Sequence, residues 1–298
     1  MIRKSTISQE FKEKISKEVI NLLSSNKSMS QNHLSRKIGI SASQLFNVQN
    51  ASKWNLISEK LWLVMGNYFQ QNEEWKTIST FNYSAIQELC NDSQSNKRML
   101  AVTGKSGLGK TTALKAYAHK NSDTFYVLVD YLQRSKEFYK AIAVSLNLEV
   151  IGNARTILQA IVEKVQSLKH PLIILDDAGK LNDGNYRNIQ LLFDATEGRA
   201  GIVLAGTPYL KGYVDKMTLK GKMGFDELRR RIEYWQSLRD PRIQEVEVIC
   251  KEAGITDESC VSYLFNAVKD FGTMKSMITS AKRSKKIITP ELLASIKP

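Results

Sequence analysis

The chain has 298 residues and a mass of 33.7 kDa, enough for roughly two or three domains. Hydrophobic side chains make up 42% of it and charged ones 24%, which excludes disordered and collagen-like proteins. No apolar run is long enough for a membrane span or a signal peptide, and three scattered cysteines without a C-x-x-C pair argue against a disulfide framework or a zinc site, so we expect a cytoplasmic protein. The formal net charge of +13 favours a polyanionic partner such as nucleic acid or a nucleotide, although an ordinary basic surface fits it equally well.

Residues 1–70 predict an all-α domain. Apolar residues at helical spacing indicate helices over residues 8–23, 31–38, 42–50 and 58–69. Gly39 stands where the turn of a helix-turn-helix needs a positive φ angle. On the helix that follows, Gln44 and Asn47 can bond base edges in the major groove. The module resembles the Cro/repressor type, and a docking role without DNA contact is the alternative.

A strand–helix alternation follows. Residues 71–97 are more polar and are predicted to be a linker around one helix at 83–90. Strands are predicted at 99–103, 125–129, 172–175 and 201–205, separated by helices at 110–119, 136–146, 154–168 and 187–196. This alternation predicts an α/β fold with a three-layer parallel-sheet core over residues 98–240. The last residues, 241–298, predict a small all-α domain of short helices without a strand.

The most specific motif lies between the first strand and its helix. It is a full G-x-x-x-x-G-K-[ST] P-loop, formed by Gly104, Lys105, Ser106, Gly107, Leu108, Gly109, Lys110 and Thr111. These residues and the next one, Thr112, are predicted to bind nucleotide through backbone N–H groups and the helix N-terminus. Lys110 would reach the β- and γ-phosphates, and the Thr111 hydroxyl would bind Mg²⁺. The predicted ligands are therefore ATP and Mg²⁺.

Two adjacent carboxylates end the strand at 172–175. Four apolar residues deliver Asp176 and Asp177 to the carboxyl end of this strand, where open α/β sheets bind ligands. We expect Asp176 to share the Mg²⁺ ion with Thr111, and Asp177 to orient or deprotonate the attacking water. An ordinary strand-to-turn sequence is the alternative.

Two further segments are weaker signals. Thr207 follows the strand at 201–205 and is predicted to sense the γ-phosphate or the attacking water, unless it is a plain turn residue. Three arginines occupy positions 229–231, just before another apolar segment at 232–238. A guanidinium group there could reach the ATP of a neighbouring copy. Nearness to the next strand favours Arg230 and Arg231, and a solvated or DNA-facing helix end is the alternative.

In this order, the P-loop, the Asp-Asp strand, the polar strand end, the arginines and the helical C-terminus resemble an AAA+ ATPase. The resemblance implies that the C-terminal helices form a lid with a basic residue aimed at the γ-phosphate. The stretch from Asp270 to Lys275 resembles the start of that lid helix, so Lys275 takes this role. The family usually has Asp-Glu where this chain has Asp176 and Asp177, and the shorter side chain predicts slow hydrolysis.

With the helix-turn-helix in front, nearly the whole chain resembles the B protein of transposable phage Mu and related transposition regulators such as TnsC and IstB. The resemblance implies ATP-dependent binding of double-stranded DNA, assembly into filaments or rings, and recruitment and stimulation of a transposase. It also implies DNA contacts from basic residues after the second and third strands and at the helix starts that follow, namely Arg134, Lys136, Arg155 and Lys180. A DnaC-like helicase loader and a transcription regulator gated by its ATPase remain alternatives.

Overall fold

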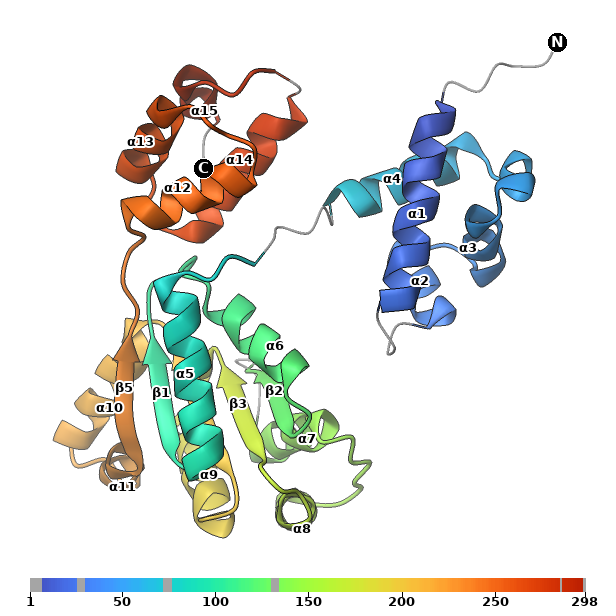
Figure 1. Cartoon of the computed structure of the whole chain (residues 1–298). Helices are drawn as coiled ribbons and strands as arrows, with labels where there is room; N and C mark the ends of the chain where they lie inside the picture. Colours follow the sequence, from blue (N-terminus) through green and yellow to red (C-terminus); the bar gives the residue numbers. More distant parts are fainter. Residues whose placement is uncertain (1–6, 26–29, 72–76, 130–133, 285, 297–298) are drawn as a thin grey trace. The chain divides into compact units, whose positions relative to one another are not determined.

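The computed structural model describes residues 7–25, 30–71, 77–129, 134–284 and 286–296. The chain divides into two compact units, Met1–Lys76 and Thr77–Pro298 (Figure 1). None of the helices among the described residues is both long and apolar enough to span a bilayer.

The first unit is all-α, as predicted. Its elements are α1 (Gln9–Ser25), α2 (Gln31–Ile38), α3 (Ala42–Gln49), the 3-10 helix η1 (Ala51–Leu56) and α4 (Glu59–Gln71). Apolar residues of α1, α2, α3 and α4 form one buried cluster. Trp62 of α4 is fully buried there and packs edge-on against Trp54 of η1, with ring centroids 5.5 Å apart. These aromatic rings therefore build the core of the unit.

The turn between α2 and α3 has the predicted geometry. Gly39 ends α2 with a φ angle of +79°, and its N–H donates to the carbonyl oxygens of Ser35 and Arg36. A residue with a Cβ atom would be strained at this angle. Ser41 then caps α3 by accepting the N–H of Gln44. The two helices are thus joined by a tight turn with a defined start and stop.

The second unit is built on a five-stranded sheet in the order β2-β3-β4-β1-β5. The strands are β1 (Met99–Thr103), β2 (Thr124–Leu128), β3 (Leu172–Asp176), β4 (Gly201–Gly206) and β5 (Ile232–Ser237). Every neighbouring pair is parallel, so the predicted parallel α/β fold is confirmed. The carboxyl ends of all five strands consequently meet at one edge of the sheet.

Helices cover both faces of this sheet. Alternate strand residues such as Leu100, Ile174 and Val203 pack against α5 (Phe81–Asn96) and α6 (Lys110–Lys120), which lie across the near face in Figure 1. The intervening strand residues face a larger core under α7 (Ser135–Ser145), α8 (Ala154–Gln166), α9 (Asp183–Ala195), α10 (Pro208–Leu219) and α11 (Phe225–Arg231). The side-chain period of two along each strand produces the predicted three layers.

Helix α5 extends well beyond the helix expected at residues 83–90. Its residues Ile86, Leu89 and Cys90 are buried against the sheet. Much of the stretch predicted as a linker, 71–97, therefore packs as a layer of the second unit, because the apolar residues of α5 fall on one helical face. The chain after β5 forms the C-terminal helices α12 (Ile243–Glu252), α13 (Glu258–Ala267), α14 (Phe271–Arg283) and α15 (Pro290–Ser295), with no strand among the described residues of this part.

Candidate nucleotide-binding site

The predicted P-loop joins β1 to α6. Gly107 and Gly109 have φ angles of +80° and +86°, which glycine adopts without strain. Gly109 occupies the N-cap position of α6, and among the described residues no side chain caps this helix start. The first N–H groups of α6 can therefore serve an anion, as phosphate-binding loops require.

The side chain of Lys110, the first residue of α6, folds back onto the start of the P-loop. The residue is only 8% exposed, and its Nζ donates to the carbonyl oxygens of Gly104 at 2.6 Å and Lys105 at 2.8 Å. Burial lowers the pKa of Lys110, while Asp176 and Asp177 act in the opposite direction. The ammonium group is thus held over the loop and within the field of both predicted carboxylates.

Asp176 ends β3 and is fully buried. Its Oδ2 accepts the Thr111 hydroxyl at 2.7 Å, and its Oδ1 accepts the N–H of Asp177 at 2.9 Å. A hydroxyl and a carboxylate in contact are the oxygen donors that suit Mg²⁺. The two predicted metal residues, Thr111 on α6 and Asp176 at the end of β3, are therefore brought together although 65 positions separate them in the chain, and this donor set fits the predicted ion.

Tyr126 was not predicted from the sequence. It lies on β2, and its hydroxyl donates to Oδ2 of Asp176 at 2.8 Å. Burial and the bond to Asp176 raise the pKa of Tyr126 far above its ordinary value, so the phenol stays protonated as a donor. Its register partner on β3 is Ile174, which places Tyr126 and Asp176 on the same face of the sheet. That alternation would have indicated the contact only if the pairing of β2 with β3 were known.

Asp177 has an unusual backbone. Its φ of 59° and ψ of 32° are left-handed, a conformation that is uncommon for residues other than glycine, although asparagine and aspartate adopt it more often than most, and that clusters at functional sites. Its Oδ2 forms an ion pair with Lys180 Nζ at 2.9 Å. The predicted general base is therefore engaged by a residue that was predicted to contact DNA.

The other predicted nucleotide residues differ in their surroundings. Leu108 is buried, whereas Ser106, Thr111 and Thr112 are exposed. Thr207 is exposed directly after β4, and the preceding residue, Gly206, accepts the N–H of Gly104 at 3.1 Å. Thr207 thus follows a residue bonded to the start of the P-loop, at the same edge of the sheet.

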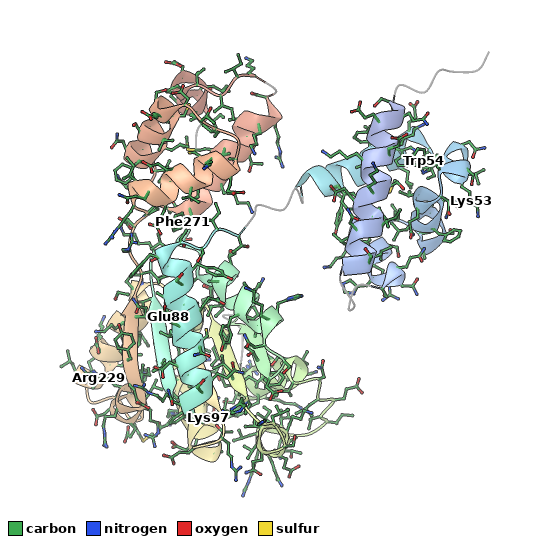
Figure 2. All side chains as sticks on the ribbon, in the orientation of Figure 1. Lys53, Trp54, Glu88, Lys97, Arg229 and Phe271 are labelled. Atoms are coloured by element: carbon green, nitrogen blue, oxygen red, sulfur yellow. The ribbon has the colours of Figure 1, made fainter. Side chains whose placement is uncertain are left out.

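Helix α14 begins beside the P-loop. The N–H of Gly272 donates to the carbonyl oxygen of Gly107 at 3.1 Å. Asp270 caps α14 through the N–H of Thr273 and lies so close to Gly107 that no Cβ atom would fit there. Phe271, labelled in Figure 2, is the first residue of this helix, and Lys275 follows one turn later with an exposed side chain.

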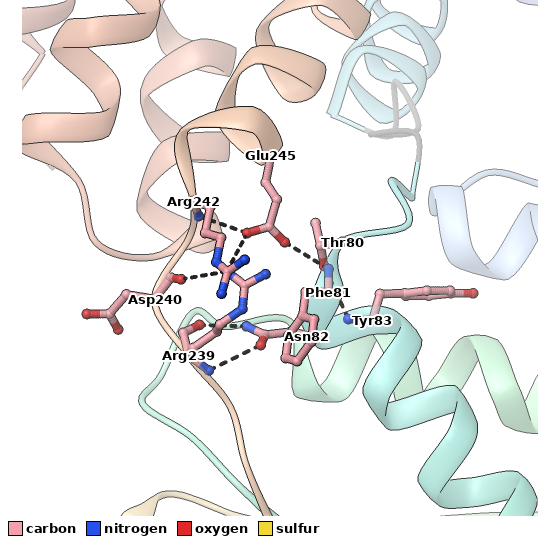
Figure 3. A network of polar contacts seen from close by, with 8 residues as sticks. All are labelled: Thr80, Phe81, Asn82, Tyr83, Arg239, Asp240, Arg242 and Glu245. Carbon is pink, nitrogen blue, oxygen red and sulfur yellow. Dashed lines mark hydrogen bonds and ion pairs between the residues drawn. The ribbon is translucent and has the colours of Figure 1, made fainter.

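A polar network joins the start of α5 to α12 and to the chain just before it (Figure 3). Glu245 of α12 accepts the N–H of Phe81 at 2.8 Å and forms an ion pair with Arg239 at 3.1 Å. The Arg239 guanidinium also lies 4.2 Å from the centroid of the Phe81 ring. The backbone carbonyl of Arg239 accepts a hydrogen bond from the side-chain amide of Asn82 at 2.8 Å. We call Phe81, Asn82, Arg239, Asp240 and Glu245 the hinge network.

The hinge network reaches the P-loop directly. Asp240 forms an ion pair with Lys105 at 3.0 Å, and Leu238 donates its N–H to Thr103 at 2.7 Å. A Cβ atom on Gly104 would lie 2.8 Å from the Cβ of Leu238. The chain between β5 and α12 is therefore packed against the first residues of the P-loop, and the predicted ligand residue Lys105 is bonded to it.

The three arginines of α11 have different partners. Arg229, labelled in Figure 2, pairs with Asp215 at 3.0 Å, and Arg231 makes two bonds to Asp194 at 2.5 and 2.9 Å. Arg230 is exposed, and among the residues that the structure describes it has no hydrogen-bond or ion-pair partner. Of the two favoured arginines, only Arg230 is thus without a partner among the described residues.

The predicted DNA-contacting residues fall into two sets. In the second unit, Arg134, Lys136 and Arg155 are exposed at or just before the starts of α7 and α8. In the first unit, the Oε1 atom of Gln44 accepts the N–H of Ser41 at 2.9 Å, and Asn47 is half-buried. The side-chain carbonyl of Gln44 thus accepts a hydrogen bond that caps α3, which the sequence interpretation did not anticipate.

Residues 92–214, which include the P-loop, match a family model described as an AAA domain. No curated protein matches the chain significantly. Among solved structures, one described as a DNA replication initiation factor has 18% sequence identity to this chain and a TM-score of 0.47. The match covers 72% of this chain and 64% of the chain of that structure. A RuvB variant of Thermotoga maritima has 14% identity and a TM-score of 0.43, covering 71% and 66%. The chain thus spans just under two thirds of each structure.

Proposed function

We propose that this protein is an ATPase that binds ATP with Mg²⁺, assembles with further copies of itself on double-stranded DNA, and recruits and stimulates a transposase in that state. The observation that carries the proposal is the contact between Thr111 and Asp176 at 2.7 Å, next to the buried Lys110. A P-loop lysine, a hydroxyl and a strand-end carboxylate together are the parts that P-loop ATPases use.

In this proposal each residue has one task. The P-loop N–H groups and Lys110 bind and orient the triphosphate. Thr111 and Asp176 hold Mg²⁺, which neutralises phosphate charge when bound. Asp177 accepts a proton from the attacking water after its carboxylate leaves Lys180. Since that ion pair must open first, and since aspartate is shorter than the usual glutamate, we expect slow basal hydrolysis.

The surroundings of the three arginines of α11 support the proposed self-association. Arg229 and Arg231 form ion pairs with Asp215 and Asp194 of their own chain. Arg230 is then the side chain that reaches the nucleotide of a neighbouring copy. An arginine supplied across a subunit boundary would make both assembly and hydrolysis depend on bound ATP.

We propose that the copies assemble on double-stranded DNA. The net charge of +13 and the exposed Arg134, Lys136 and Arg155 support contact with phosphates rather than bases. The cap bond of Gln44 weighs against the transcription-regulator alternative, because that alternative needs α3 to read bases. The transposase as partner, rather than a helicase, is proposed from the resemblance of the whole chain.

Co-sedimentation with plasmid DNA tests the proposal. The full chain is mixed with random-sequence plasmid in Mg²⁺ with ATP or without nucleotide, at several salt concentrations. We expect ATP-dependent binding that weakens steeply with salt and shows no preferred sequence. Equal binding without nucleotide would contradict the ATP switch. A defined footprint would favour the transcription regulator, and preference for single strands would favour the helicase loader.

A further inference from the structure

The buried carboxylate of Asp176 has a partner that no motif assigns. Tyr126 and Thr111 both donate to Oδ2, at 2.8 and 2.7 Å, while the N–H of Asp177 donates to Oδ1 at 2.9 Å. A carboxylate offers about four acceptor positions. Among the described contacts, three are therefore used by the protein, which leaves about one for a metal-bound water.

The three donors differ in what else they must do. Thr111 is predicted to bind Mg²⁺ through its hydroxyl oxygen. The N–H donor of Asp177 belongs to a residue whose side chain is proposed to take part in hydrolysis. Tyr126 has no such second task. It lies on the edge strand β2, which pairs with β3, and Lys115 Nζ lies 5.3 Å from its ring centroid. Its hydroxyl therefore reaches Asp176 from the strand that pairs with β3.

The burial of Asp176 raises the energetic cost of losing the hydrogen bond from Tyr126. Asp176 is 0% exposed, so bulk water does not replace a lost donor, and a buried carboxylate that loses a hydrogen bond is destabilised or turns toward another partner. We propose that Tyr126 is a positioning residue of the Mg²⁺ site, whose hydroxyl fixes the rotation of the Asp176 carboxylate so that it and Thr111 hold the ion together. This inference rests on the proposed function and specifies one further residue of the same site.

The test is Tyr126→Phe in the full chain, with binding of the fluorescent nucleotide mant-ATP as the measurement. The Mg²⁺ concentration that gives half of the metal-dependent binding should rise about 10-fold, as for other residues that orient a metal ligand. Binding in excess EDTA should stay within about two-fold of wild type, because the P-loop contacts do not involve Tyr126. In an Asp176→Asn background, Tyr126→Phe should add no further change.

Tyr117→Phe is the matched control. Tyr117 is a buried tyrosine on α6, whereas Tyr126 is half-buried, and the Tyr117 hydroxyl donates to Gln94 Oε1 at 2.6 Å, away from Asp176. It should leave the Mg²⁺ dependence unchanged. An unaltered Mg²⁺ dependence in Tyr126→Phe, or an equal loss of binding in EDTA, overturns the positioning role. Wild-type protein that binds no mant-ATP in either condition overturns the proposed function and, with it, this inference.

Discussion

The P-loop edge of the sheet and the exposed side of α3 are both predicted to bind a polyanion, but they are organised differently. At the P-loop edge, Lys110 and Asp176 are buried and bonded to neighbouring groups. On α3, Gln44 is exposed and its carbonyl caps the helix, while Asn47 is half-buried. Polar groups that are buried must find partners within the fold, so they are already in place before a ligand arrives.

The difference teaches that the two regions need different tests. A site held by buried bonds is changed strongly and locally by one substitution. A surface that depends on its partner reveals its role only when that partner is present. Arg230 belongs to the second kind, although it serves the first region, because it is exposed and lacks a partner among the described residues.

The largest effect is expected for Arg230→Ala. Loss of an arginine that stabilises transition-state charge across a subunit boundary costs about 10³-fold or more in hydrolysis. Phosphate release with DNA present should therefore fall by about that factor, while mant-ATP binding stays unchanged. This result would show that the P-loop edge is completed by a second copy.

Arg229→Ala is the control for that experiment. It removes a charge of the same helix, but only the exposed ion pair with Asp215 is lost, and such pairs contribute little. Hydrolysis should change no more than about two-fold, within the range of a small surface effect. A larger loss in Arg231→Ala than in Arg230→Ala would transfer the role to Arg231.

A smaller effect is expected for Asp177→Asn. Loss of a general base costs about 10²-fold or more, whereas the P-loop and Asp176 still hold the nucleotide. ATP-dependent co-sedimentation with DNA should persist and dissociation should slow, because the bound triphosphate is no longer consumed. Hydrolysis at the wild-type rate would show that Asp177 is only a strained turn residue.

The smallest effect distinguishes the two polar residues of α3. Gln44→Ala removes the bond to Ser41 and should lower the stability of the first unit by about 1 kcal/mol. Asn47→Ala should leave stability within about 0.5 kcal/mol. Urea unfolding followed by tryptophan fluorescence, with Trp54 and Trp62 in this unit, measures both. A loss of DNA binding in Asn47→Ala without a loss of stability would assign α3 a DNA contact.

The fold and the centre of the site were predictable because their signals are local. The P-loop glycines, Lys110 and the strand-end Asp176 each follow from a short motif next to a recognisable strand. Gly39 was predictable for the same reason, because one turn required its φ angle. The parallel sheet followed from the alternation of strands and helices.

The missing parts come from pairings across the chain. Tyr126 reaches Asp176 because β2 lies beside β3, and Asp240 reaches Lys105 because the chain leaves β5 beside β1. Strand order is set by the packing of the whole sheet, so no local pattern carried these contacts. Helix α5 was predicted short because its polar residues resemble a linker, whereas its buried stripe becomes visible only against the sheet.

The central claim is that ATP at the P-loop allows copies of this chain to line up on duplex DNA. Negative-stain electron microscopy of the full chain with Mg²⁺, ATP and random-sequence duplex tests it directly, with Lys110→Ala as the matched variant. The account predicts continuous protein-coated DNA for the wild type only, and bare DNA for Lys110→Ala or without ATP. Single particles with ATP and duplex, or equal coating by Lys110→Ala, would contradict it.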